Sequence, residues 1–404
     1  EIIWNLSDTV YTGTFAGLYM PVVITSVAPG DYLLVVKDAN GCSMTRLLTV
    51  TEPQPVNVVF GASDYNGFNI SCETYDDGSV WVSNITGGSP PYSYLWSTTD
   101  GSIPGSTTNN NIVDVTAGTY DLEVTDAMGC TFNFSISLTE PDGVDLISQV
   151  LSLSPNKDYN ISCFGRNDGS IDLEFDTDVA ISTYVWTGPA GAVLTQNVPD
   201  QTGLIGGNYN LIVTDANLCT RSFDFTLSEP DSVAMSVVKS LTGDGMYNIS
   251  CNGENGSIDI TVTGGSPGNY SYSWKDNNDP LWNSALEDQA SIKAGSYRVY
   301  VTDANGCAVD RGISLTQPMP LALSLGVTEI TCESPLLDNG AIDLTVTGGK
   351  TPYSFLWSNG ETSEDITGLT AGSYSVTVTD DYGCIETIDT VLYIPESLTI
   401  SKGI

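Results

Sequence analysis

The stretch IKAGSYRVYVTDANGC, residues 292–307, decides the fold of this 404-residue chain, because it recurs along the sequence. Close copies are VTAGTYDLEVTDAMGC at 115–130 and LTAGSYSVTVTDDYGC at 369–384, and weaker copies end at Cys42 and Cys219. An alternating apolar and polar run that leads into a Gly-containing turn is typical of a β-hairpin. A fixed period of this kind indicates a tandem array of small domains.

Two further motifs recur in register with the hairpin. NISC or EITC, usually followed by D/N-G-S, contains Cys72, Cys163, Cys251 and Cys332, and a motif of the kind Y-S-Y-L-W contains Trp96, Trp186, Trp274 and Trp357, with Trp4 in the same slot. We expect about seven short strands in each unit, the first ending at the NISC cysteine. The last two strands are expected to be joined by a two-residue Asn-Gly turn with both residues at positive φ.

This pattern predicts an all-β fold of tandem immunoglobulin-like (PKD/fibronectin-like) β-sandwich repeats. Short linkers such as Thr-Glu-Pro leave little room for independent motion, so an elongated, semi-rigid rod is expected. The incomplete units at both ends predict a longer array of the same repeat. The expected boundaries are a C-terminal part of a repeat at 1–53, complete repeats at 54–141, 142–230, 231–318 and 319–395, and the start of another repeat at 396–404.

The recurring aromatic residues are predicted to form the sandwich cores. The Trp of the third strand would be buried between the two sheets, and the Tyr two positions after a Gly has the setting of a tyrosine corner. Core packing is favoured over ligand stacking because these residues recur at inward-facing strand positions. The predicted core residues are Trp96, Trp186, Trp274, Trp357, Tyr120, Tyr209, Tyr297 and Tyr374, with Tyr32 at the equivalent position of the first unit.

An Asp precedes every hairpin turn and is expected to accept backbone N–H groups there. The alternative role for these carboxylates is Ca²⁺ binding, and no other cofactor is expected. The residues concerned are Asp38, Asp126, Asp215, Asp303 and Asp380.

Nine cysteines in register suggest disulfides formed in an oxidising compartment. In a sandwich of this strand order, the two cysteines of one unit lie at opposite ends, about 25 Å apart, whereas a disulfide needs Cα atoms about 4.4–6.8 Å apart. Bonds between consecutive units are therefore favoured, and an intradomain bridge in another topology is the alternative. The expected pairs are Cys72–Cys219, Cys163–Cys307 and Cys251–Cys384, with the partners of Cys42, Cys130 and Cys332 in missing or incomplete units.

Composition argues against several classes of function. The net charge of −37 disfavours nucleic acid and anionic lipid as partners, and no apolar window is long enough to span a membrane. The N-terminus has no signal sequence, so the chain is expected to be mature or a fragment. Histidine, the commonest general base, is absent. Adjacent acids such as Asp76 and Asp77 are better explained by an Asp-Gly turn than by a catalytic acid and base. We therefore expect no enzyme activity.

Taken together, the motifs resemble the SprB-type repeat. The residues that carry the resemblance are ISC followed by DGS, ITGGSPPYSYLW (85–96), LTAGSYSVTVTD (369–380), DANGC and LTEP (138–141), over essentially the whole chain. The third unit departs, with EFDTDVA at 174–180 where others have ITGG or VTGG. The resemblance implies a giant cell-surface adhesin of gliding Bacteroidetes, exported by type IX secretion and working with the cell-surface motility machinery.

The sequence therefore predicts an extracellular structural and adhesive stalk that transmits force to an adhesive tip during adhesion and gliding. Its partners would be neighbouring repeats and a surface polysaccharide or substratum. The alternative is a carbohydrate-binding array, suggested by variable loops such as KDNNDPLW (275–282) and TTNNN (107–111), where Trp282 looks like a platform for a sugar ring.

Overall fold

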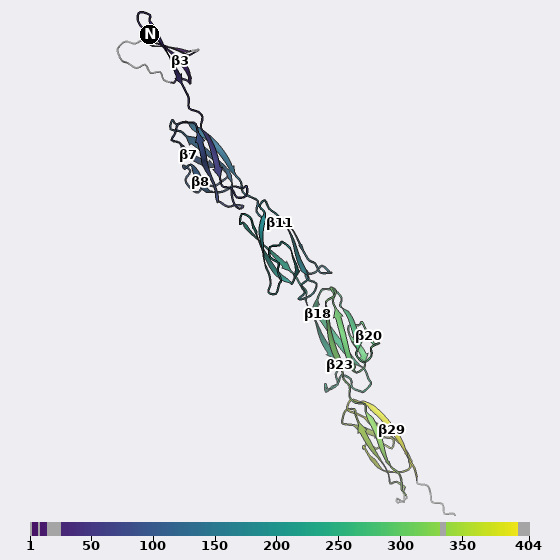
Figure 1. The fold of residues 1–404 in the computed structure, drawn as a ribbon. Helices are drawn as coiled ribbons and strands as arrows, with labels where there is room; N and C mark the ends of the chain where they lie inside the picture. The colour runs from purple at the N-terminus through teal and green to yellow at the C-terminus, as the bar shows by residue number, and fades with distance from the viewer. Residues whose placement is uncertain (1, 7–8, 14–25, 332–336, 395–404) are drawn as a thin grey trace, which may run out of the picture. The chain divides into compact units, whose positions relative to one another are not determined.

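The computed structural model describes residues 2–6, 9–13, 26–331 and 337–394, and side chains from residue 26 onward. The described residues form short β-strands and no helix (Figure 1). Two compact units can be distinguished, and the third repeat contributes to both. The first consists of residues 1–147, 174–185 and 212–222, and the second of residues 148–173, 186–211 and 223–404.

The first unit begins with one four-stranded sheet of order β2-β1-β3-β4. In it, Trp4 pairs with Leu34 across β1 and β3, as Trp96 pairs with Leu122 in the next repeat. The register of the Trp motif is therefore the same in both. The strands are β1 (Ile2–Leu6), β2 (Thr9–Gly13), β3 (Gly30–Lys37) and β4 (Ser43–Val50).

The second repeat, also in the first unit, shows the full sandwich arrangement. One sheet has the order β5-β6-β8 and the other the order β10-β9-β7, all antiparallel. This division of strands is that of an immunoglobulin-like sandwich. The strands are β5 (Asn57–Ala62), β6 (Gly78–Thr86), β7 (Ser93–Thr98), β8 (Asn111–Val115), β9 (Gly118–Thr125) and β10 (Thr131–Leu138).

The third and fourth repeats have the same strand order. The third forms sheets β11-β12-β14 and β13-β15-β16, and the fourth forms β17-β18-β21 and β20-β19-β22-β23. Their strands are β11 (Asp145–Leu151), β12 (Gly169–Asp176), β13 (Ile181–Thr187), β14 (Gln201–Leu204), β15 (Gly207–Asp215), β16 (Thr220–Leu227), β17 (Asp231–Lys239), β18 (Gly256–Gly265), β19 (Ser271–Asp276), β20 (Asn283–Ser284), β21 (Gln289–Ile292), β22 (Gly295–Thr302) and β23 (Ala308–Leu315).

The fifth repeat completes the second unit with sheets β24-β25-β27 and β26-β28-β29. Its strands are β24 (Ala322–Thr328), β25 (Gly340–Thr347), β26 (Ser354–Trp357), β27 (Ile366–Leu369), β28 (Gly372–Thr379) and β29 (Ile385–Leu392). The chain is thus an all-β series of tandem β-sandwich repeats. The predicted fold class is confirmed in this respect.

Each core is built from the residues that face inward, and these alternate with outward-facing residues along each strand. In β22, Tyr297, Val299 and Val301 are buried, and they pack against Trp274, Ile258 and Ile292 of the fourth repeat. Strands half-buried in this way need a period of two, which is what the repeated motif supplies. The second and fifth repeats contain equivalent clusters around Trp96 and Trp357.

The four Trp residues of the complete repeats have exposures of 2% or less. Each indole Nε1–H also donates to a backbone carbonyl in the loop that follows the Trp strand. Because a buried indole N–H needs an acceptor, this bond fixes the variable loop against the core. The pairs are Trp96–Asn109 (3.0 Å), Trp186–Val198 (2.9 Å), Trp274–Leu286 (2.9 Å) and Trp357–Ser363 (2.9 Å).

The repeated Tyr forms a tyrosine corner in all five repeats. Its hydroxyl donates to the carbonyl oxygen four residues earlier, just before the strand begins. The pairs are Tyr32–Ala28 (2.5 Å), Tyr120–Thr116 (2.7 Å), Tyr209–Ile205 (2.7 Å), Tyr297–Lys293 (2.8 Å) and Tyr374–Thr370 (2.9 Å). Tyr120, Tyr209 and Tyr297 are fully buried, whereas Tyr374 is only half-buried.

Three details differ from the sequence-based expectation. The NISC cysteine does not end the first strand, since Cys251 lies in the loop between β17 and β18. The second, third and fifth repeats have six described strands, and only the fourth has seven. In the hairpin turn, Gly306 has positive φ (+87°) but Asn305 does not. The turn is an Asp303-to-Gly306 turn (N···O 3.1 Å) that ends in a left-handed glycine.

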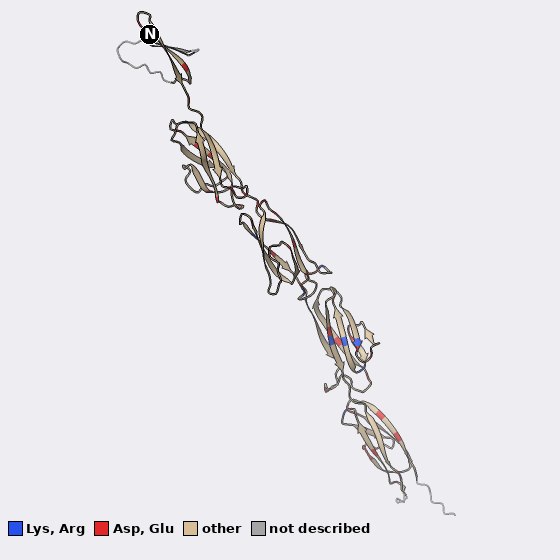
Figure 2. Ribbon diagram, viewed as in Figure 1, with Lys and Arg blue, Asp and Glu red and all other residues tan. Residues whose placement is uncertain are grey.

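Acidic residues are spread along the strands and loops of the repeats, and basic residues are sparse (Figure 2). Of the residues that the structure describes, none belongs to a helix long and apolar enough to cross a bilayer.

The corner hydroxyl can be tested with Tyr297→Phe, which keeps the buried ring and leaves the Lys293 carbonyl without its donor. We expect a loss of about 1 kcal/mol in the stability of the fourth repeat, measured by hydrogen exchange of the β22 amides. Tyr300→Phe is the matched control, because Tyr300 lies on the same strand with an exposed side chain. Equal protection in the two variants would contradict the role of the corner.

Candidate functional site: the cystine junctions

The first half of the site is the loop between the first two strands of a repeat, residues 240–255 in the fourth repeat. Asn248, of the NISC motif, is buried and organises this loop. Its Oδ1 accepts from the N–H and hydroxyl of Thr316 (3.0 and 3.1 Å), and its Nδ2 donates to the Ser240 carbonyl (2.8 Å). The loop is thereby fastened to the end of the last strand of its own repeat. Asn69 with Thr139 and Asn160 with Ser228 repeat the arrangement.

A second contact follows the cysteine and involves the linker; we call this contact and that of Asn248 the clasps. The Gln317 side chain of the Thr-Gln-Pro linker accepts from the N–H of Gly253, two residues after Cys251 (2.9 Å). Glu140 does the same for Thr74 (2.7 Å), as does Glu229 for Gly165 (2.8 Å). The linker is therefore bound to the loop on both sides of the NISC cysteine.

The residues between the clasp and the cysteine are also fixed. Ile70 is fully buried and lies over Gly78, where a Cβ would be 2.3 Å from the Ile70 side chain. The Asp77 carboxylate accepts from the N–H of Ser71 (3.0 Å). This explains the Asp-Gly of the D/N-G-S motif, since the Asp folds the loop and the Gly makes room for the Ile.

The second half of the site is the hairpin turn, where the Asp acts as predicted. Asp303 Oδ1 accepts from the N–H groups of Asn305 (3.0 Å) and Cys307 (2.8 Å). Its Oδ2 accepts from Ser266 N–H (2.7 Å), which belongs to another loop of the same repeat. Equivalent bonds to the cysteine N–H come from Asp38, Asp126, Asp215 and Asp380. The hydrogen bond from Cys130 N–H lowers the pKa of Asp126.

Three disulfides join these two halves, and each connects one repeat to the next. The structure places Cys72 with Cys219, Cys163 with Cys307 and Cys251 with Cys384, at Cα separations of 5.7, 5.6 and 5.5 Å. These separations lie within the usual range for cystine. They are the same three pairs that are favoured when the two cysteines of one repeat lie at opposite ends of that repeat.

The unpaired cysteines occupy equivalent hairpin positions. Cys42 and Cys130 are free and exposed, and Cys332 lies outside the described residues. The Cys130 turn has the same Asp126 bonds as the bonded turns, so it has the same local conformation as its paired counterparts.

The residue two positions before each hairpin cysteine contacts the loop of the previous repeat. Asn217 donates to the Ser71 carbonyl (2.9 Å), and Asn305 donates to the Ser162 carbonyl (3.2 Å). The Sγ atoms of Cys219 and Cys307 lie 3.2 Å from the same two carbonyl oxygens. At these two junctions the covalent bond is therefore accompanied by a side-chain hydrogen bond to the residue before the partner cysteine.

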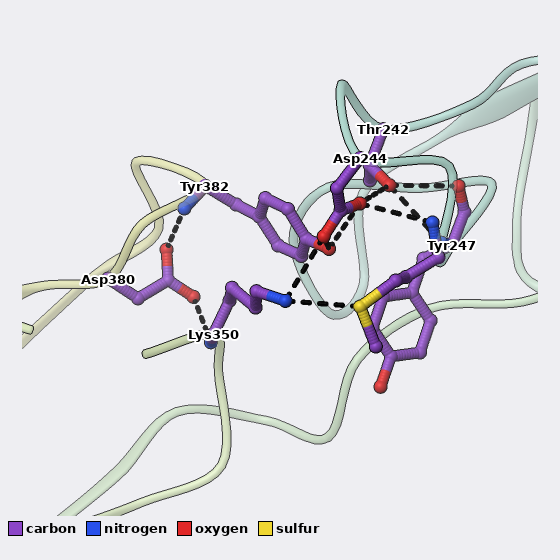
Figure 3. Close-up of polar contacts among 7 residues, drawn as sticks. Thr242, Asp244, Tyr247, Lys350, Asp380 and Tyr382 are labelled. Carbon is purple, nitrogen blue, oxygen red and sulfur yellow. Dashed lines mark hydrogen bonds and ion pairs between the residues drawn. The ribbon is translucent and has the colours of Figure 1, made fainter. Parts of the chain in front are cut away.

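At the junction of the fourth and fifth repeats the equivalent residue is Tyr382 (Figure 3). Its hydroxyl lies 2.8 Å from both carboxylate oxygens of Asp244. Lys350 Nζ lies 3.1 Å from Asp244 Oδ2, and the ring of Tyr247 packs edge-on against Tyr382. A polar cluster thus replaces the simple Asn contact of the other two junctions.

The charge state of this cluster follows from its contacts. Hydrogen bonds from the Thr242 hydroxyl, Met246 N–H, Tyr382 hydroxyl and Lys350 hold the pKa of Asp244 well below its ordinary value. The hydrogen bond to Asp244 raises the pKa of Lys350. The ion pair is therefore formed across the physiological pH range. Its contribution to stability is present above the ordinary Asp pKa near 3.8 and is lost only as pH falls through the lowered value.

The other sequence candidates do not gather into a chemical site. Asp77 is engaged with Ser71 N–H, and no group of three or more His, Cys, Asp or Glu among the described residues is placed to hold a metal ion. Trp282 is not an exposed platform, because it packs against Tyr297 (ring centroids 5.3 Å apart) at the edge of the core. Trp81, which the sequence does not single out, is 40% exposed.

Sequence reasoning missed the clasp residues. Asn69, Asn160 and Asn248 recur three positions before the cysteine, and the linker Glu or Gln recurs before its Pro. The repetition was a usable signal, but the partners lie 64 to 70 residues apart in the chain, as between Gly253 and Gln317 or Asn69 and Thr139. Nothing local in the sequence connects them.

The comparison with protein families agrees with this geometry. The SprB repeat matches residues 68–101, 247–279 and 327–362, in each case from the loop of the NISC or EITC motif to the Trp strand or just beyond it. The chain contains SprB repeats. These matched regions lie in the second, fourth and fifth repeats. In the third repeat residues 176–178 replace the Gly-Gly turn, and Asp178 accepts from Asp142 N–H (3.0 Å). No curated protein matches the sequence.

Solved structures that are similar to this chain include three proteins. An adhesin of an Antarctic bacterium, described as Ca²⁺-stabilised and binding ice, is 18% identical (83% of this chain, 96% of that chain, TM-score 0.28). The human desmocollin-1 ectodomain is 13% identical (91% and 87%, TM-score 0.23). The insect immune protein hemolin is 12% identical (78% and 95%, TM-score 0.21).

The clasp can be tested with Asn248→Ala, which leaves Thr316 N–H and the Ser240 carbonyl without partners in a buried place. We expect a loss of about 1–3 kcal/mol in the stability of the SprB repeat and faster hydrogen exchange at Thr316. Asn252→Ala is the matched control, because Asn252 is an exposed residue of the same loop with one bond to Pro318. Unchanged exchange at Thr316 in Asn248→Ala would contradict the clasp.

The polar cluster can be tested with Lys350→Met. Removing the ammonium group should raise the pKa of Asp244, though not to its ordinary value, because the Thr242, Met246 and Tyr382 donors remain. The measurement is a pH titration of the Asp244 carboxyl carbon by NMR. Lys275→Met, a change at an exposed position of the fourth repeat, should leave the midpoint where it is. An unmoved midpoint in Lys350→Met would show that the junction contact does not form in solution.

Proposed function

We propose that this chain is a structural stalk segment of a large cell-surface adhesin, which extends an adhesive tip and transmits force from it. The observation that supports this most directly is the cystine junction, which recurs at three successive boundaries. A stalk must resist separation of its domains, and a covalent bond at each of these three boundaries meets that need.

The recurring residues of the SprB repeats have structural explanations. The Trp and Tyr fill and fasten the core, the Asp and Asn shape the two loops, and the cysteines join them. An extracellular, oxidising location follows from this design, because structural disulfides persist outside the cytosol. Export by type IX secretion and a role in gliding motility, with the motility machinery as a partner, belong to this proposal through the SprB resemblance.

The proposal includes repeat boundaries at residues 53, 141, 230, 318 and 395, and an elongated arrangement of the stapled repeats. Cys42, Cys130 and Cys332 would pair in the full-length adhesin with cysteines of missing repeats or of the missing parts of incomplete repeats. No catalytic role is proposed. The carbohydrate-binding array has less support, because its best platform, Trp282, is packed against the core.

The pairing is tested first by non-reducing peptide mapping of the whole chain with mass spectrometry. We expect cross-linked peptides that contain Cys72 with Cys219, Cys163 with Cys307 and Cys251 with Cys384, since these pairs are within bonding distance. Peptides that join Cys163 to Cys219 would instead mean intradomain bridges. The repeats would then be separate domains, and their loops would have to be screened for ligands.

The stalk role is tested on cells that display the full-length adhesin with Cys72→Ser and Cys219→Ser. These cells should attach normally in still medium and detach at lower shear, because one junction has lost its covalent bond. Met44→Ser with Val193→Ser, at two exposed positions outside the junction contacts, is the matched control. Loss of attachment in still medium, or binding of the purified chain to a glycan array, would favour the carbohydrate alternative.

A further inference from the structure

The three disulfides overlap along the chain, and the overlap has a definite topology. They close loops of 147, 144 and 133 residues. Cys163 lies inside the loop closed by Cys72 and Cys219, and Cys251 lies inside the loop closed by Cys163 and Cys307. Every backbone position from 72 to 384 is therefore enclosed by at least one covalent loop.

We infer that the bonds turn the chain into a covalent ladder with two interleaved rails, which carries tension past the cores of the repeats. This inference rests on the proposed stalk function. One rail runs from Cys42 to Cys72, across the disulfide to Cys219, on to Cys251, and across to Cys384. The other runs from Cys130 to Cys163 and across to Cys307.

The rails are made of the same structural parts in each repeat. From Cys219 to Cys251 the first rail consists of the last strand of one repeat (β16), the linker and the first strand of the next (β17). The segments between the two cysteines of a repeat are the rungs, for example Cys251 to Cys307 with β18 to β22. A rung can unfold without lengthening either rail.

The two rails are also bound to each other at the linkers that follow the second, third and fourth repeats. Ser228 and Glu229 of the first rail bind Asn160 and Gly165, which flank Cys163 of the second rail. Thr316 and Gln317 of the second rail bind Asn248 and Gly253 around Cys251 of the first. The clasps described above are thus contacts between rails. They keep load shared while the repeats are folded.

The ladder sets the greatest distance to which the chain can be pulled. Between residues 72 and 384 the shortest covalent path passes through only the roughly 30 residues from Cys219 to Cys251, or about 110 Å when fully extended. After reduction the path contains roughly 310 residues, or about 1,100 Å. Intradomain bridges would give roughly 90 residues, or about 310 Å.

Single-molecule pulling of the oxidised full chain, held at its two ends, measures this limit directly. We expect dithiothreitol to lengthen the 72-to-384 span about tenfold. Cys163→Ser with Cys307→Ser should leave the oxidised limit near 110 Å, because the first rail does not use that bond. Cys72→Ser with Cys219→Ser should raise it to about 510 Å, through roughly 147 residues that use the second rail. A limit near 310 Å in the natural sequence, or equal limits in the two variants, would overturn the ladder.

A chemical cleavage checks the topology without any substitution or folding requirement. Cyanogen bromide cuts after the methionines, and Met128, Met235, Met246 and Met319 each fall between bonded cysteines. The ladder predicts that the pieces containing residues 45–128, 129–235, 247–319 and 320–404 stay together until they are reduced. Release of the last two pieces without reductant would contradict it. The pieces could stay together while cells with Cys72→Ser and Cys219→Ser resist shear as well as unchanged cells do. That result would support the ladder and contradict the stalk function.

Discussion

A disulfide forms only when two Cα atoms are held about 4.4–6.8 Å apart, so each cystine junction depends on two loops that are already in the right places. On one side, the NISC loop is held by a buried Asn and by the linker Glu or Gln. On the other side, the hairpin cysteine is held by an Asp that accepts its N–H. Free loops of this length would lose backbone entropy of about 1–2 kcal/mol per residue on bonding. The hydrogen bonds within each repeat offset part of this cost, because they fix both loops without any contribution from the disulfide.

The contacts at the junctions divide into a constant and a variable class. The Asn, Asp and Ile positions that shape the loops are used in the same way in successive repeats. The residue two positions before the bonded hairpin cysteine differs, and is Asn217, Asn305 or Tyr382. Exposed ion pairs such as Arg221–Glu73 add little stability on their own. The constant class therefore makes the bond possible, and the variable class distinguishes one junction from the next.

The sequence predicted well whatever repeats at short range, and less well whatever depends on distant partners. The period located the strands, the buried Trp and the tyrosine corners. The turn was misread because Asp303 accepts two N–H groups, which stabilises a turn with a single left-handed glycine at Gly306. Tyr374 is less buried than its counterparts because the loop after its Trp strand has only eight residues, 358–365. In the second repeat the longer loop brings Gly101 over the Tyr120 hydroxyl.

The charge of the chain explains why every junction needs its own fastening. A net charge of −37 spread over 404 residues produces repulsion along the whole chain. At physiological salt this repulsion is screened beyond about 8 Å, so it acts mainly within a repeat and between adjacent loops. This short-range repulsion has to be opposed at each boundary separately, because a bond at one boundary does not hold together another boundary two repeats away. One disulfide with its clasps at each of the three successive boundaries from the second to the fifth repeat opposes the repulsion there, and its overlap with the next disulfide links these three boundaries covalently.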